Sequence, residues 1–337
     1  FSKKEINKGK ILSEKDFIIR SPRTGLTFDE YKKLKSKILK KDLKKNVSIT
    51  KDYFTNKSYK LNNKEITFCD YYNISLPLRL HDYEFYYKNF PITNYELHLS
   101  FNEVNFLDNN FNSLANKIIL DYKKYSIHLP DYISNNNIFD PLSINKSIRK
   151  ESLNVFRKTI KLAKYISNKT KKRTIVVGSF SRINNEVKEK KLKEIFSFLK
   201  KYTSKDVIIY PQWLPKIAWY YGGAEIQSLF SDKIDIDFII KNKKKICLDI
   251  AHLILSSNYE NTNWFENFKK LKSLTGHFHL SDAKDVSSEG VILGKGDLKN
   301  IKEMLKLPCS KVIETWQGHL NNGEGFYKTI KYLIKYS

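Results

Sequence analysis

The sequence predicts an α/β protein in which a (β/α)8 TIM barrel follows a small β-rich module. From about residue 65 onward, short runs of β-branched and aromatic residues alternate with longer amphipathic segments, which is typical of a parallel sheet covered by helices. Eight such runs in about 270 residues match the size and strand number of one barrel. The first 55 residues contain no His, Cys or Trp, so we expect a separate module there.

The eight strands follow from the positions of these runs. We expect them at residues 74–80, 95–101, 125–129, 174–178, 207–210, 245–249, 277–281 and 311–314. A long helix is expected at residues 144–167, where Leu153, Phe156 and Ile160 keep a spacing of three to four residues. We therefore expect a module at residues 1–56, a connection at 57–68 and the barrel at 69–337.

Composition limits the class of protein. Of 337 residues, 41% are hydrophobic and 14% aromatic, which suffices for a large core and excludes wholesale disorder. The net charge of +25 suggests a polyanionic partner. However, only seven of the 61 cationic residues are Arg, the residue that base and phosphate recognition favours. We therefore expect a solvated lysine surface and no nucleic-acid partner.

The chain lacks the sequence features of membrane and secreted proteins. No apolar run approaches the roughly 18 residues of a spanning helix, and no signal segment opens the chain. Cys69, Cys247 and Cys309 lie in apolar runs without a metal-binding spacing, as expected of thiols in a reducing compartment. We expect a cytoplasmic protein without a membrane partner. Because Phe1 falls within an apparent strand, we also expect a missing N-terminal portion.

The first module contains an internal repeat. Residues 6–13 (INKGKILS) return at residues 43–50 (LKKNVSIT), and Gly9 and Asn46, which tolerate positive φ, occupy the same turn position. The repeat predicts a pseudo-symmetric β module. The segments EINKGKIL (5–12), IRSPRTGL (19–26) and LKK (43–45) resemble the SAF (antifreeze-like) domain of bacterial sialic acid and related nonulosonate synthases.

The SAF resemblance implies a partner and a pathway. In that family a loop arginine reaches the amino-sugar substrate in a synthase barrel, which here would lie upstream or in trans. Ser21 stands at the arginine position, so Arg20 or Arg23 would substitute for it, unless the module is only a structural cap. The implied role is in nonulosonic acid or surface polysaccharide biosynthesis, with this chain as part of a larger synthase fusion.

Histidines gather near the predicted strand ends of the barrel. Six of the seven do so: His81, His98, His128, His252, His277 and His279. Barrels place active-site groups at the C-terminal ends of their strands. Asp249, His279 and Glu314 come from strands six, seven and eight, so we expect them to converge as a nitrogen and oxygen ligand set for Mn, Co, Zn or Mg.

The large domain resembles the xylose-isomerase-like superfamily, which includes sugar phosphate isomerases and epimerases and the endonuclease IV group. The segments that carry the resemblance are YELHL (95–99), IHLP (127–130), LDIAH (248–252), HFHLSD (277–282), EGVILGKGD (289–297) and VIE (312–314). The resemblance implies that Asp249, His279 and Glu314 hold a divalent metal and that His252 holds or protonates the substrate.

The sequence departs from that family at the fifth strand. Gln212 in the segment YPQ is the nearest oxygen donor to the position of the family's metal-binding glutamate. An amide can ligate a metal but cannot act as a base, which leaves Glu314 as the carboxylate for proton transfer. Glu96, His128 or His252 would then supply the second group, or the barrel does not perform epimerase chemistry.

Further residues are expected to bind substrate at the rim. Arg79 and His81 would contact a sugar acid or phosphate, although Arg79 could instead pair with Asp82. Trp219 would stack on a sugar ring, or else serve core packing or the subunit contact of a homodimer. The glycine-rich loop at 289–297 would bind phosphate or carboxylate through Lys295. Three other polar residues near strand ends are also expected to bind substrate: Glu96, His98 and Asp282.

Together these features predict a metal-dependent sugar or sugar-phosphate isomerase or epimerase. Two other functions remain open: a non-catalytic sugar-binding or assembly domain of a synthase, and an endonuclease IV-like abasic-site nuclease. The absence of a P-loop, a GxSxG elbow and a dinucleotide fingerprint argues against nucleotide hydrolysis and serine esterase chemistry.

Overall fold

The computed structural model describes the chain except residues 21–23, 181, 183–186 and 221–222, and except the side chains of residues 108–116. The chain divides into two compact units. The first comprises Phe1–Lys60 and Gln317–Lys328, and the second comprises Leu61–Trp316 and Thr329–Ser337. This division ends the first unit a few residues beyond position 56 and adds to it a C-terminal segment that the sequence pattern groups with the barrel.

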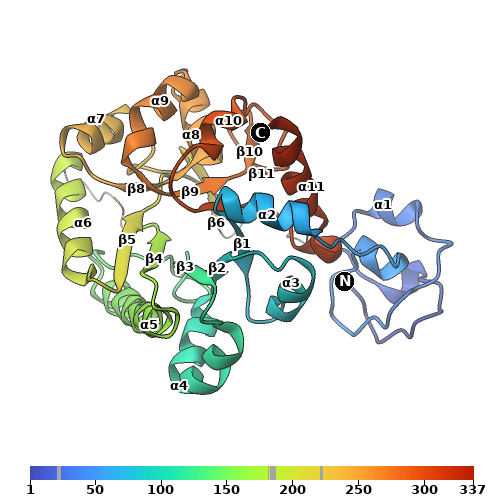
Figure 1. The fold of residues 1–337 in the computed structure, drawn as a ribbon. Coiled ribbons are helices and arrows are strands. Elements are labelled where there is room, and N and C mark those ends of the chain that lie inside the picture. The colour runs from blue at the N-terminus through green and yellow to red at the C-terminus, as the bar shows by residue number, and fades with distance from the viewer. Residues whose placement is uncertain (21–23, 181, 183–186, 221–222) are drawn as a thin grey trace. The chain divides into compact units, whose positions relative to one another are not determined.

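The second unit is the predicted α/β barrel, with eight parallel strands surrounded by helices (Figure 1). The strands lie in the order β5-β4-β3-β2-β1-β12-β9-β8. Their bounds are β1 Ile74–Leu78, β2 Asn94–His98, β3 Lys124–His128, β4 Thr174–Gly178, β5 Val207–Pro211, β8 Ile246–Asp249, β9 Thr275–Leu280 and β12 Lys311–Ile313. A parallel bridge between Gln212 and Cys247 joins the two ends of the sheet, so Gln212 lies at the seam of the barrel.

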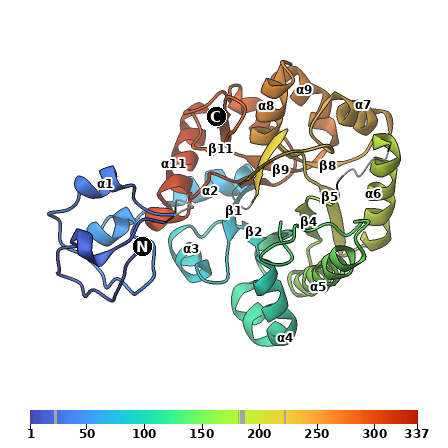
Figure 2. The same cartoon turned by 180° about the vertical axis from the view of Figure 1, so that it is seen from behind.

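Helices cover the outside of the strands (Figure 2). Their bounds are α2 Asn63–Tyr71, α3 Tyr83–Asn89, α4 Phe101–Ile118, α5 Lys146–Thr170, α6 Lys188–Tyr202, α7 Lys233–Lys241, α8 Ile250–Tyr259, α9 Trp264–Leu271, η3 Lys272–Leu274 and α10 Ile301–Leu305. The last helix, α11 Leu320–Tyr336, belongs to this unit only from Thr329 onward. Two predicted strands end two or three residues earlier than expected. Residues 79 and 80 leave β1 for a turn that Asp82 caps, and Phe101 begins α4 instead of ending β2.

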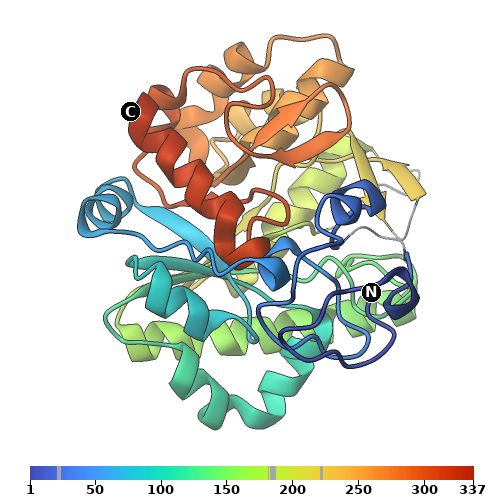
Figure 3. The same cartoon turned by 90° about the vertical axis from the view of Figure 1, so that its right-hand side faces the viewer.

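Two antiparallel hairpins extend the chain after β5 and β9. The first pairs β6 (Ile217–Tyr220) with β7 (Gly223–Ile226), and the second pairs β10 (Asp282–Lys284) with β11 (Ser288–Val291). They can be followed in Figure 3 by their colours, yellow for β6–β7 and orange for β10–β11. Both hairpins follow the C-terminal ends of barrel strands, where barrels carry their active sites.

Apolar side chains fill the barrel below these ends. Tyr210 packs there with Val177 and Cys247, and a Cβ on Gly276 would lie only 2.4 Å from the Tyr210 ring. Glycine at position 276 therefore makes room for a large aromatic side chain inside the barrel. Along the described part of the chain, no helix combines the length and the apolar character needed to cross a membrane.

The first unit is built on the internal repeat. Gly9 and Asn46 both have positive φ, +88° and +62°, as the repeat predicts. Ile6 and Leu43, equivalent residues of the two copies, form an antiparallel bridge and exchange two backbone hydrogen bonds of 2.9 Å. The β structure of residues 1–20 and 24–60 consists of such isolated bridges, accompanied by short helices at η1 Glu14–Asp16, α1 Phe28–Lys32 and η2 Lys51–Phe54.

The pairing of the two copies has approximate two-fold symmetry. The N–H of Gly9 donates to the carbonyl of Leu39, and the N–H of Asn46 donates to the carbonyl of Ser2. The two contacts are equivalent, because the 37-residue offset of the repeat relates Gly9 to Asn46 and Ser2 to Leu39. Buried Leu12 and Ile49, also equivalent, contribute to one apolar core. The repeat thus encodes both the turns and the core of this unit.

Candidate active site

The predicted metal-binding residues converge at the C-terminal ends of the barrel strands. Asp249 on β8 is in register with His279 on β9, and Val312 on β12 is the register partner of His279 on the other side. His98 and His128 end β2 and β3 and are also in register. Parallel pairing therefore places these side chains in one layer of the barrel.

His279 lies at the centre of this layer. Its Nδ1 is 2.9 Å from Glu314 Oε2 and 3.8 Å from Asp249 Oδ2. The amide of Gln212 fills the space between neighbours, with Nε2 3.4 Å from Asp249 Oδ2 and 3.1 Å from His279 Nδ1, and Oε1 3.0 Å from His128 Nε2. Gln212, His128, Asp249, His279 and Glu314 thus form one connected polar cluster.

The charges of this cluster are strongly coupled. Burial opposes the charged form of His279, but the neighbouring Cys247, Glu314 and Glu96 raise its pKa well above the usual value. Burial likewise opposes ionisation of Glu314, yet the His279 charge and hydrogen bond lower its pKa far below the usual value. Burial dominates at Asp249 and raises its pKa to about 6. These shifts favour the charged forms of His279 and Glu314, whereas at Asp249 they favour the neutral form relative to a free carboxyl group.

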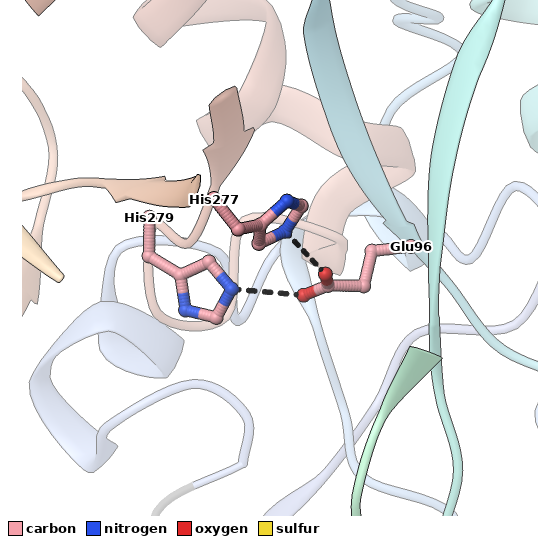
Figure 4. A group of neighbouring side chains, drawn as sticks. All are labelled: Glu96, His277 and His279. Atoms are coloured by element: carbon pink, nitrogen blue, oxygen red, sulfur yellow. Dashed lines mark hydrogen bonds and ion pairs between the residues drawn. The ribbon is translucent and has the colours of Figure 1, made fainter. Parts of the chain in front are cut away.

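A second polar layer, centred on Glu96, lies deeper in the barrel. Figure 4 shows the imidazoles of His277 and His279 both directed at this carboxylate, with Nε2 to carboxylate distances of 2.7 Å and 3.1 Å. Ser126 donates a hydrogen bond of 2.7 Å to the same group, and His98 Nε2 lies 3.0 Å from it. The Glu96 side chain is fully buried among these partners, and its expected role in substrate binding stays a prediction.

This deeper layer orients the cluster above it. Because Nε2 of His279 faces Glu96, its Nδ1 is presented to Glu314 and Asp249. A carboxylate behind a histidine is the usual way in which proteins fix a metal-binding imidazole. The sequence reasoning did not include His277 or Ser126 in the site. Alternation along β9 could have revealed His277, because residues two apart share one face of a strand.

His252 lies beside the cluster and is held on both ring nitrogens. Its Nδ1 is 2.9 Å from the Trp213 carbonyl and 3.3 Å from Asp249 Oδ2, and its Nε2 is 3.4 Å from Glu289 Oε2. Burial opposes protonation, but Asp249 and Glu289 raise the pKa of His252 to about 9. Glu289 belongs to the predicted loop, yet the sequence did not single it out as a site residue.

In the loop after β9, several backbone N–H groups that could bind an anion already donate to a carboxylate of the protein. The Asp282 carboxylate accepts hydrogen bonds from the N–H groups of Ala283, Gly294, Gly296 and Leu298, at 2.8–2.9 Å. Asp282 is fully buried and holds this loop through these hydrogen bonds, and its expected role in substrate binding stays a prediction. Lys295 is exposed at the tip of the same loop.

The basic and aromatic residues predicted to bind substrate at the rim are exposed or are paired with other residues. Arg79 pairs with Asp82 at 3.4 Å, the alternative considered for it, while His81 is exposed. Trp219, 59% exposed, lies on the face of the β6–β7 hairpin opposite Tyr220, which packs against Tyr132 from the loop after β3. Trp219 is therefore directed away from that contact.

Two arginines of the first unit, Arg20 and Arg23, are also expected to bind substrate. Arg20 is exposed, with its guanidinium 5.4 Å from the centre of the Phe1 ring. Arg23 lies outside the described residues. Its expected role in substrate binding stays a prediction.

These features define a (β/α)8 barrel with a buried histidine and carboxylate cluster at the C-terminal ends of its strands. No family model and no curated protein matches the sequence. Among solved structures, a D-tagatose 3-epimerase-like protein is similar at 17% identity and a TM-score of 0.50, over 77% of this chain and 96% of that one.

Two further structures share this fold. The 3-keto-D-glucoside 4-epimerase YcjR from E. coli is 12% identical, with a TM-score of 0.50 over 78% of this chain and 99% of that one. A family 2 AP endonuclease from Brucella melitensis is 9% identical, with a TM-score of 0.50 over 75% and 96%. At these identities the similarity establishes the fold of the barrel.

Proposed function

We propose that the barrel is a metal-dependent isomerase or epimerase acting on a sugar or sugar phosphate. The observation that carries this proposal is the convergence of Asp249, His279 and Glu314 around one point, with His279 oriented from behind by Glu96. The similarity of the barrel to epimerase structures is consistent with it.

The donor set fits a divalent metal. His279 Nδ1, the carboxylates of Asp249 and Glu314, and the Gln212 oxygen once its amide turns would hold the ion, with His128 as a further nitrogen donor. Such a mixed set suits Mn, Co, Zn or Mg. The bound metal would polarise the carbonyl and the neighbouring hydroxyl of the sugar.

The chain's own residues would move the proton. Glu314, part of whose side chain is solvent-accessible, would accept a proton from the sugar carbon beside the carbonyl. His128 and His252 border the same cluster and would hold the substrate oxygens, and one of them would return a proton to the carbon skeleton. Glu96, buried behind His279, would keep that imidazole in place during the reaction.

Exchange of carbon-bound hydrogen tests this function. We expect the purified protein to contain or require a divalent metal and to introduce deuterium from heavy water into a substrate of a sugar and sugar-phosphate panel. Glu314→Gln should lower the exchange rate by about 100-fold or more, because it removes the proton acceptor. Glu266→Gln, on the exposed side of α9, is the matched control. Unchanged exchange in Glu314→Gln, or full exchange after metal removal, would contradict the proposal.

A non-catalytic sugar-binding barrel is the second candidate, and one observation favours it. The Gln212 amide nitrogen contacts Asp249 and His279 together, at the place where a metal would otherwise be bound. If this amide replaces the metal, the protein would bind sugar without exchange into any member of the panel. The same experiment therefore separates the two candidates.

We propose further that residues 1–56 are an SAF module acting in nonulosonic acid biosynthesis in the cytoplasm. The segments at 5–12, 19–26 and 43–45, together with the two-fold pairing of the repeat, support this assignment. The full chain should then stimulate a sialic acid synthase barrel that lacks its own SAF domain.

The role of Arg20 can be measured in that complementation. We expect Arg20→Gln to reduce the stimulated synthase rate by about 10-fold, because a charged hydrogen bond to substrate is lost. Lys15→Gln, also exposed in this unit, should leave the rate unchanged. Failure of the full chain to stimulate the synthase would count against the SAF assignment.

A further inference from the structure

We infer that the barrel site takes an unphosphorylated sugar, a conclusion that rests on the proposed function and narrows its substrate class. The first observation is the loop after β9. Its backbone N–H groups, including those of Gly294 and Gly296, form the kind of cradle that binds phosphate oxygens. The carboxylate of Asp282 already accepts four of these hydrogen bonds, so an internal anion takes the place that a substrate phosphate would need.

Two described arginines near the C-terminal ends of the strands, Arg79 and Arg182, are paired with carboxylates of the protein itself. Arg79, after β1, contacts Asp82 at 3.4 Å through its guanidinium, and its backbone N–H donates to the same carboxylate at 2.9 Å. Arg182, after β4, pairs with Glu225 on the β6–β7 hairpin and lies 5.4 Å from the centre of the Tyr220 ring. Binding a phosphate through either arginine would require breaking an existing ion pair.

Two carboxylates of the site, by contrast, are partly exposed. Glu289 is 46% exposed and lies 3.4 Å from His252 Nε2, and Glu314 lies across the cluster. The hairpin that carries Glu289 is fixed in place: Gly290 has a φ of +65°, its carbonyl accepts the Trp316 N–H at 2.7 Å, and a Cβ on it would lie 2.6 Å from Trp316 Cβ. These contacts hold the backbone next to Glu289.

This arrangement selects against a dianion. Beside Glu289 a phosphate would meet a like charge, and two described arginines near the strand ends, Arg79 and Arg182, are already paired. Sugar hydroxyls, however, donate hydrogen bonds that carboxylates accept. The site is thus suited to a neutral sugar or an amino sugar.

Titration with inorganic phosphate tests the inference without requiring turnover. In about 0.15 M salt, which screens the surface lysines, we expect phosphate to bind the full-length protein more weakly than about 1 mM, as followed by ³¹P NMR. Arg79→Gln and Lys295→Gln should not change the result, with Lys299→Gln as the matched control for a nearby exposed lysine.

Saturable binding tighter than about 1 mM that either Arg79→Gln or Lys295→Gln abolishes would overturn the inference. Weak binding, or binding that neither substitution changes, supports it. Lys295 is exposed, so its variant remains informative even if Arg79→Gln does not fold.

Deuterium exchange with matched sugars separates this inference from the proposed function. D-fructose should be exchanged faster than D-fructose 6-phosphate, and D-ribulose faster than D-ribulose 5-phosphate, by about 10-fold or more. Faster exchange with the esters would overturn the inference. Exchange with no sugar at all counts against the proposed epimerase, while the phosphate titration still decides whether the site accepts a phosphate.

Discussion

Replacing Glu96 with glutamine is expected to lower the free energy of unfolding by about 3 kcal/mol, because it removes a buried charge that His277 and His279 contact directly. The glutamine amide group would also place an N–H donor beside the Nε2 atoms of His277 and His279, which face carboxylate oxygens in the native protein. Affinity of the neighbouring cluster for a divalent metal should fall by about 10- to 100-fold, because His279 loses the carboxylate that orients it. Urea denaturation and metal titration measure the two effects.

The effect of Glu96→Gln should depend on pH in a defined direction. Burial opposes ionisation of Glu96, but His279 and His277 hold its pKa well below the usual value of 4.5. A carboxyl group with a lowered pKa in the folded state stabilises the protein above the unfolded-state pKa. The stability difference between the native protein and the variant should therefore be full above about pH 4.5 and shrink in stronger acid.

Ser126→Ala is the matched control for Glu96→Gln. It removes one hydrogen bond to the same carboxylate without changing a charge, and should cost only about 1 kcal/mol with little pH dependence. Equal losses in the two variants, or a difference from the native protein that grows in acid, would show that the Glu96 charge does not stabilise this layer.

The second large effect is expected at Asp282. Asp282→Asn should lower the free energy of unfolding by about 3 kcal/mol, since one of its two side-chain groups becomes a donor facing two N–H groups. The loss is local to the loop after β9. Hydrogen exchange should therefore accelerate at Gly294, Gly296 and Leu298 before it does in the barrel strands.

Asp297→Asn provides the comparison for Asp282→Asn. Asp297 accepts from Asp285 N–H and Asn258 Nδ2 at 3.2–3.3 Å in more exposed surroundings, so its loss should cost about 1 kcal/mol or less. If the two variants are equally stable, or if loop exchange is unchanged in Asp282→Asn, Asp282 is not the group that holds this loop.

Much of the fold follows from local sequence pattern. The eight barrel strands are recognisable because short β-branched and aromatic runs are separated by amphipathic segments, and each forms at the expected place. Gly9 and Asn46 adopt the positive φ that their shared position in the repeat predicts. The convergence of Asp249, His279 and Glu314 also follows from a local rule, because C-terminal strand ends share one face of a barrel.

The roles of Glu96, Asp282 and Glu289 follow instead from contacts between distant segments. Glu96 on β2 meets His277, 181 residues further along the chain, and nothing in the segment YELHL distinguishes a buried partner of histidines from a substrate-binding acid. The position of Asp282 after a strand predicts a site residue, but in the structure its carboxylate accepts hydrogen bonds from four N–H groups of its own loop. Likewise, only the β10–β11 turn brings Glu289 to His252.

The sequence by itself therefore determined the strands, the turns of the first unit and the face of the barrel that carries the polar cluster, because these depend on residue periodicity and backbone preference. The tertiary structure alone decided which carboxylates are partly exposed and which are buried against hydrogen-bond donors of the protein itself. The physical reason is that a buried carboxylate must find donors, and which donors reach it depends on how the closed barrel and its loops bring distant segments together.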